Sequence, residues 1–139
     1  CMVTSKRTGP RNHMNASLAV LVVEDDFLIR TCLMEFLQDS GMAVREAENC
    51  AEAAEAVRSE PVLHALVADL TLPDGDGMAI THLARDKWPD LPVIYISGHG
   101  ALRRDETSGD PARDRFISKP YTLASILEAI EDMTGSSTS

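Results

Sequence analysis

The sequence predicts an α/β fold in which a parallel β-sheet is covered by helices on both faces. Short apolar segments alternate along the chain with segments whose apolar residues recur at helical spacing. The short segments are almost continuously apolar and rich in valine, isoleucine and leucine, which is typical of strands buried on both faces. At 139 residues, 44% of them hydrophobic and 25% charged, the chain has the length and composition of one globular domain.

The first strand is expected at residues 18–23, where the apolar run LAVLVV stops at three consecutive acids. The last of these acids, Asp26, is placed to begin a helix, which Gly41 ends. The apolar positions of that helix follow the spacing i, i+3, i+4, i+7 and i+8. They are Ile29, Cys32, Leu33, Phe36 and Leu37. We therefore expect Cys32 to be a small buried hydrophobic residue.

The second strand is expected at residues 43–46, and an alanine-rich helix follows at residues 50–58. Asn49 immediately precedes that helix and has a side chain suited to capping it. The third strand, at residues 63–68, is another apolar run, and it stops at Asp69.

A helix is expected at residues 76–87, followed by strands at residues 93–96 and 115–118. The last helix begins after Thr122, a good capping residue. Its apolar face is formed by Leu123, Ile126, Leu127 and Ile130. Between the fourth and fifth strands, residues 98–111 contain several glycines, one proline and few large apolar residues. The fourth helix is therefore expected to be short or irregular.

The two ends of the chain lack this alternation. Residues 1–13 are polar and open on a cysteine, so we interpret them as a tag-derived or disordered leader. The domain is then expected at residues 14–134, followed by a flexible tail at residues 135–139. No apolar run has the length of a membrane span, and no secretory signal is evident. The three cysteines show no paired spacing, which favours a reducing, cytoplasmic location.

Chemically active groups follow four of the expected strands. In a parallel α/β sheet, the carboxyl ends of the strands form the edge at which ligands bind. The residues expected there are Glu24, Asp25, Asp69, Ser97 and Lys119. Three clustered carboxylates repel one another unless a cation lies between them, and oxygen-only ligands favour Mg²⁺ or Mn²⁺. A lysine and a hydroxyl opposite such a cation could neutralise a phosphoryl group transferred to one of the carboxylates.

Four segments in this order resemble the receiver domains of bacterial two-component response regulators, the CheY-like superfamily. They are LVVEDD at 21–26, VADLTLPDGDG at 67–77, PVIYISG at 92–98 and FISKP at 116–120. The resemblance implies a flavodoxin-like, doubly wound (βα)5 fold with a five-stranded sheet of order 2-1-3-4-5. The segment around PVIYISGHG further resembles a subgroup, alphaproteobacterial single-domain or hybrid-kinase-attached receivers, whose fourth helix is irregular.

The resemblance also implies roles for individual residues. Asp69 would be the phosphoacceptor. Asp25, Asp69 and the main-chain carbonyl of Thr71 would bind Mg²⁺ directly, with Glu24 acting through water. The remaining roles concern the phosphoryl group and the switch that follows its transfer. They fall to Ser97, Lys119, Phe116 at the aromatic switch position, and a cis Lys119–Pro120 peptide bond.

The expected function is that of a signalling domain, with self-phosphorylation and autodephosphorylation at the aspartate as its chemistry. The phosphoryl donor would be a histidine kinase or a histidine phosphotransfer protein, and the downstream protein partner is unknown. The domain would be a monomer or a weak phosphorylation-dependent dimer. With a net charge of −9, direct nucleic-acid binding is disfavoured, and no membrane contact is expected.

Two alternatives stay open at this point. A haloacid-dehalogenase-type phosphatase also places a nucleophilic aspartate at a strand end, but it requires an acid two residues later, where Thr71 stands. A phosphate-independent interaction module is the other alternative. Such modules usually lack one or more of the site residues, and this sequence has all of them.

Overall fold

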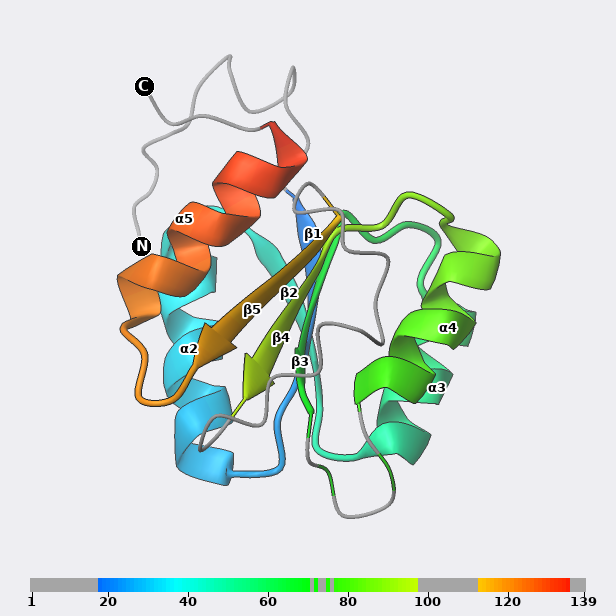
Figure 1. Cartoon of the computed structure of the whole chain (residues 1–139), viewed down its shortest axis with the longest axis horizontal. Helices are drawn as coiled ribbons and strands as arrows, with labels where there is room; N and C mark the ends of the chain where they lie inside the picture. Colours follow the sequence, from blue (N-terminus) through cyan, green and yellow to red (C-terminus); the bar gives the residue numbers. More distant parts are fainter. Residues whose placement is uncertain (1–17, 71, 73–74, 76, 98–112, 136–139) are drawn as a thin grey trace.

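The computed structural model describes residues 18–70, 72, 75, 77–97 and 113–135. All five strands found there are parallel, in the order β2-β1-β3-β4-β5, which confirms the predicted doubly wound fold. Along the chain the elements are β1 (Ala19–Val23), α2 (Phe27–Asp39), β2 (Ala43–Ala47), α3 (Cys50–Ser59), β3 (Ala65–Asp69), α4 (Gly77–Lys87), β4 (Val93–Ser97), β5 (Asp114–Ser118) and α5 (Leu123–Thr134). Helices α2 and α5 cover one face of the sheet, and α3 and α4 cover the other (Figure 1).

Several predicted features lie outside the described residues. These are the leader at 1–13, the short or irregular fourth helix within 98–111, Thr71, and most of the tail at 135–139. Within the described part of the chain, no helix combines the length and the apolar character that a membrane crossing requires.

The core is divided into two layers by the sheet. Along β1, Val20 and Val22 pack toward α2 and α5, whereas Leu21 and Val23 pack toward α3 and α4. The central strands β3 and β4 alternate in the same way, since side chains on consecutive residues of a strand point to opposite faces. This burial on both faces explains why the strands are continuously apolar in the sequence.

The predicted capping residues are confirmed. Asp26 accepts hydrogen bonds from the main-chain N–H groups of Leu28 (3.0 Å) and Ile29 (3.1 Å) at the start of α2. Asn49 caps α3 and Thr122 caps α5 in the same manner. The cap at Asp26 fixes where α2 begins, three residues after Glu24, the first acid of the carboxyl edge.

The buried face of α2 differs from the predicted one. Its buried residues are Arg30, Leu33 and Leu37, while Cys32 is exposed, so the expectation of a buried Cys32 is wrong. The helix faces the sheet along the spacing i, i+3, i+7, and a charged residue occupies the first of these positions. Arginine is tolerated there because its guanidinium finds carbonyl and carboxylate acceptors, described below.

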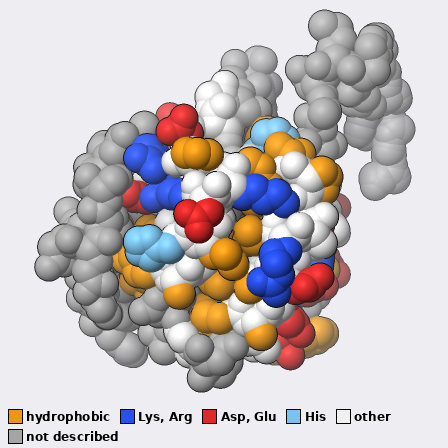
Figure 2. Space-filling model, turned by 90° about the vertical axis from the view of Figure 1, so that its right-hand side faces the viewer, with side chains coloured by type: hydrophobic (Ala, Val, Ile, Leu, Met, Phe, Trp, Pro, Cys, Tyr) orange, Lys and Arg blue, Asp and Glu red, His pale blue; other side chains and the backbone are white. Residues whose placement is uncertain are grey.

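The amino edge of the sheet, opposite the predicted site, is held by basic side chains. Arg85 of α4 donates to the main-chain oxygens of Leu91 (2.8 Å) and Arg113 (2.9 Å) and pairs with the buried Asp114 (2.9 Å). Lys87 donates to carbonyls at the end of α3, including that of Val57 (2.9 Å). On the α3 and α4 side of the molecule, basic and acidic side chains lie among hydrophobic ones (Figure 2).

Candidate functional site

Three carboxylates meet at the carboxyl edge of the sheet. Glu24 and Asp25 follow β1, and Asp69 is the last residue of β3. These strands are neighbours, with Val23 opposite Ala68 in their register, so the acids lie side by side. Each of the three offers a carboxylate oxygen within 4.8 Å of the other two. We call Glu24, Asp25 and Asp69 the acidic site.

Lys119, directly after β5, provides positive charge to the acidic site. Its Nζ donates a hydrogen bond to Asp69 Oδ2 at 3.0 Å and lies 4.0 Å from Glu24 Oε1. The Lys119–Pro120 peptide bond is cis, as the resemblance implies. The lysine thus reaches Asp69 across the intervening strand β4.

Two of the carboxylates are almost inaccessible to solvent, and burial changes the ionisation of one of them, Glu24. Glu24 is 3% exposed and Asp69 is 4% exposed. Burial raises the pKa of Glu24 to about 7, and the charge of Asp69 adds to this effect, although a hydrogen bond from the Asp26 N–H opposes it. The pKa of Lys119 is raised because the Asp69 hydrogen bond and nearby carboxylates outweigh its own burial. One ammonium group therefore does not neutralise the acidic site.

This arrangement fits a divalent cation with hard ligands. The donors are all oxygen atoms, they come from two adjacent strand ends, and Asp25 is exposed and so accessible to an incoming ion. Mg²⁺ and Mn²⁺ favour such oxygen ligands and keep water in their other positions. A cation would also offset the repulsion that raises the pKa of Glu24.

The other predicted site residues are described to different extents. Ser97 ends β4, opposite Ser118 of β5, which places it on the same edge of the sheet; its side chain lies outside the described part of the structure. Thr71 also lies outside it. Phe116 is half-buried and stacks on Tyr95, with ring centroids 5.0 Å apart.

A hydrogen-bonded chain connects this aromatic pair to the neighbourhood of Asp69. The Tyr95 hydroxyl and Thr81 Oγ1 lie 2.8 Å apart, and Thr81 Oγ1 donates to the main-chain oxygen of Gly77 at 3.1 Å. A Cβ on Gly77 would lie only 2.9 Å from the main-chain oxygen of Asp69 and 3.0 Å from Ala68 Cβ. Glycine is thus needed where α4 begins against the end of β3.

Two residues near the acidic site were not predicted from the sequence. Arg30 could have been recognised because it shares the i, i+3, i+7 positions of Leu33 and Leu37 on α2. Tyr121 follows the cis peptide bond, and its hydroxyl is buried without a hydrogen-bond partner among the described residues. Burial raises the pKa of Tyr121 to about 12, with further contributions from the charges of Glu24 and Asp69. No pattern in the sequence indicated that Tyr121 would lie near the acids.

The fold and the acidic site define a doubly wound α/β domain with a cluster of carboxylates at the carboxyl edge of its sheet. The family model described as the response regulator receiver domain matches residues 20–131. The chain therefore belongs to the response regulator receiver domain family.

Individual relatives agree with this assignment. The response regulator receiver protein CpdR of Brucella abortus is 32% identical over 114 residues, covering 82% of this chain and 94% of that protein. The KDP operon transcriptional regulatory protein KdpE of Escherichia coli is 35% identical over 108 residues, covering 77% of this chain but 47% of that protein. A crystal structure of a response regulator receiver protein from Sinorhizobium medicae has a TM-score of 0.78 at 26% identity and covers 86% of this chain and 96% of that one.

Membership of this family shows the class of function. The chain is a phosphoacceptor receiver domain of the two-component type, with a role in signalling, and nothing in the comparisons favours a phosphatase. Receiver domains bind Mg²⁺ at an acidic pocket, and Glu24, Asp25 and Asp69 form an acidic cluster here. The family also interacts with histidine kinases or phosphotransfer proteins.

Proposed function

We propose that Asp69 accepts a phosphoryl group from the phosphohistidine of a histidine kinase or histidine phosphotransfer protein. The observation that carries this proposal is the position of Asp69, between the Lys119 ammonium at 3.0 Å and the carboxylates of Glu24 and Asp25. In the transfer, the N–P bond of the donor breaks, a carboxylate oxygen of Asp69 forms the new P–O bond, and the departing imidazole nitrogen takes up a proton.

Mg²⁺ is the proposed cofactor, with Mn²⁺ as a substitute. Asp25, Asp69 and the main-chain carbonyl of Thr71 would hold it directly, and Glu24 would act through water. When bound, the cation neutralises charge on the phosphoryl oxygens. Glu24 must be ionised to take part, so the proton that its raised pKa favours has to leave first.

After transfer, we propose that Lys119 and Ser97 contact the phosphoryl oxygens and that Phe116 takes part in the resulting switch. Lys119 is already within reach of Asp69, and its ammonium would exchange a carboxylate partner for a phosphoryl one. The change would alter contacts with a protein partner in the cytoplasm. The domain would act as a monomer or as a weak dimer that forms on phosphorylation.

Labelling with a small phosphodonor tests the proposal. The purified chain is incubated with acetyl phosphate and Mg²⁺, and covalent phosphate is measured by intact-mass spectrometry. We expect labelling of the native chain and of Asp132→Asn, a control that alters an exposed carboxylate on α5. Asp69→Asn should show no labelling, because the amide is not a nucleophile for phosphorus. Labelling of Asp69→Asn equal to that of the native chain would disprove the assignment.

A further inference from the structure

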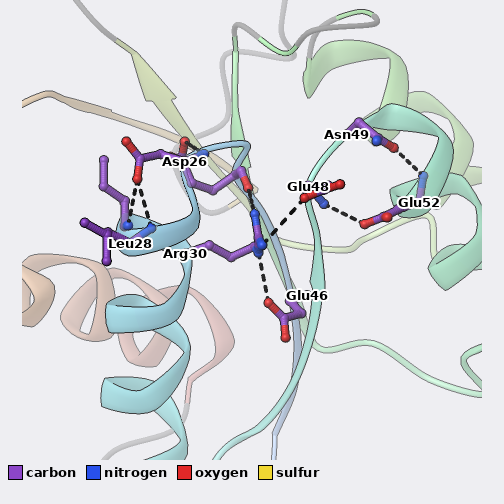
Figure 3. Close-up of polar contacts among 9 residues, drawn as sticks. Asp26, Leu28, Arg30, Glu46, Glu48, Asn49 and Glu52 are labelled. Carbon is purple, nitrogen blue, oxygen red and sulfur yellow. Dashed lines mark hydrogen bonds and ion pairs between the residues drawn. The ribbon is translucent and has the colours of Figure 1, made fainter.

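Arg30 of α2 is a charged residue in a nearly closed environment. It is 7% exposed, and its guanidinium contacts three groups from different parts of the carboxyl edge (Figure 3). Nη1 donates to the main-chain oxygen of Glu24 at 2.8 Å, Nε donates to Glu46 Oε1 at 2.9 Å, and Nη2 lies 3.7 Å from Glu48 Oε1. One side chain thus connects the ends of β1 and β2.

The contact with Glu24 completes the restraints on that residue. The Glu24 N–H donates to the Ala47 oxygen at 3.0 Å, and its carbonyl accepts from Arg30. Its carboxylate accepts from the Asp26 N–H at 3.1 Å, and the carbonyl of Asp26 in turn accepts from the Arg30 N–H at 2.9 Å. Each main-chain polar group of Glu24 is therefore fixed, and so is the direction in which its carboxylate points.

The acidic residues that pair with Arg30 also lie in a hydrogen-bonded part of the chain. Glu46 and Glu48 belong to β2 and the loop that follows it, and the Glu48 N–H donates to Glu52 Oε1 at 2.9 Å. Asn49 accepts from the Glu52 N–H at 2.8 Å and caps α3, so the loop is tied to the first turn of that helix (Figure 3). Arg30 consequently links the Glu24 carbonyl to a loop that is itself hydrogen-bonded to α3.

We infer that Arg30 is a positioning residue for cation binding, which it supports by fixing Glu24 so that its carboxylate faces Asp69. The inference rests on the proposed function of the acidic site. Arg30 touches the carbonyl of Glu24 and not its carboxylate, so it orients this acid without pairing with its charge. Groups that orient metal ligands typically change metal affinity by about 10- to 100-fold when they are removed.

A positioning role and a purely electrostatic role of Arg30 predict opposite changes in Mg²⁺ affinity when a neutral residue replaces it. Arg30→Gln removes a positive charge near the acidic site, which by Coulomb's law alone should tighten Mg²⁺ binding. Loss of positioning should weaken it. Arg30→Lys keeps the charge but loses the planar group that reaches Glu24 and Glu46 together. Electrostatics therefore predicts little change for Arg30→Lys, whereas positioning predicts weaker binding.

Isothermal titration calorimetry with MgCl₂ on the native chain and the variants decides between these possibilities. We expect both Arg30 variants to bind Mg²⁺ roughly 10-fold or more weakly, and excess Mg²⁺ to restore their labelling by acetyl phosphate. Arg45→Gln is the matched control. It removes the same charge from β2, where Arg45 pairs with Glu60 and contacts Ser59, and its affinity should be no weaker than that of the native chain. Thermal unfolding establishes whether each variant is folded. If Arg30→Gln does not fold, the Mg²⁺ affinity of Arg30→Lys decides the question by itself.

Amide hydrogen exchange of the metal-free chain provides a second measurement. The N–H groups of Glu24 and Asp26 should exchange faster in Arg30→Lys than in the native chain, while those in β3 stay unchanged. Unchanged or tighter Mg²⁺ binding by the folded Arg30 variants would overturn the inference and leave the proposed function intact. If the native chain itself bound no Mg²⁺, the proposed function would fail, and the role of Arg30 with it.

Discussion

Mg²⁺ binding is expected to strengthen as the pH rises from 6 to 8, because a proton on Glu24 competes with the cation. Burial raises the pKa of Glu24 from 4.5 to about 7. At pH 6 only about a tenth of the metal-free molecules would have Glu24 ionised, against about nine tenths at pH 8, so the apparent affinity should increase about tenfold. The increase should level off above pH 8, where Glu24 is already ionised.

The same shift has a consequence for stability without metal. A raised pKa means that the folded chain holds a proton which the unfolded chain releases, so this contribution is complete below about pH 4.5 and is lost as the pH rises to about 7. A displacement from 4.5 to about 7 corresponds to about 3 kcal/mol. The metal-free chain should therefore lose stability as the pH rises from about 4.5 to about 7, and Mg²⁺ should restore it.

Two measurements check this reasoning. Calorimetric titration with Mg²⁺ at pH 6, 7 and 8 gives the affinities, and urea unfolding in EDTA from pH 4.5 to pH 8 gives the free energies of unfolding. Glu24→Gln is the comparison variant, since it cannot titrate, and both pH dependences should be much smaller in it. An affinity for Mg²⁺ that is the same at pH 6 and pH 8, or an undiminished pH dependence in Glu24→Gln, would refute the argument.

Two further predictions concern the surroundings of Asp69. Gly77→Ala should destabilise the chain by about 1–3 kcal/mol in urea unfolding, because the new Cβ would meet the Asp69 oxygen and Ala68; full stability would show that the start of α4 can move at no cost. Lys119→Gln should bind Mg²⁺ several-fold more tightly in calorimetry, because the ammonium 3.0 Å from Asp69 repels the cation. Weaker binding by Lys119→Gln would mean that the lysine supports the metal site.

Much of the fold could be predicted because hydrophobic burial shows directly in the pattern of residues. Strands buried on both faces are continuously apolar, and the acids that follow them mark the carboxyl edge, as for β1 and Glu24. Boundaries were less accurate: the third strand was expected at residues 63–68 and lies at Ala65–Asp69. Leu63 is buried, but it precedes the strand, and burial alone does not distinguish a strand from the segment that leads into it.

The polar contacts around the site could not be predicted from local patterns. Periodicity placed Cys32 in the core because its thiol is weakly polar, and although Arg30 shares the spacing of Leu33 and Leu37, its charge argued against burial. The acceptors that make Arg30 acceptable there belong to Glu24, Glu46 and Glu48, which only the folded chain brings together. The contact between Tyr95 and Thr81 likewise joins two elements whose pairing no single-sequence pattern records.

The basic side chains at the amino edge of the sheet influence which part of the domain can change its structure when a phosphoryl group is added to Asp69. Arg85 locks the connections leading into β4 and β5 to α4, and Lys87 joins α4 to the end of α3. These bonds brace the end of the domain farthest from Asp69. We therefore expect the response to an added phosphoryl charge to be concentrated at the carboxyl edge, while the strands keep their register. The domain would then signal through changes at the carboxyl edge of the sheet, while the amino edge keeps its structure.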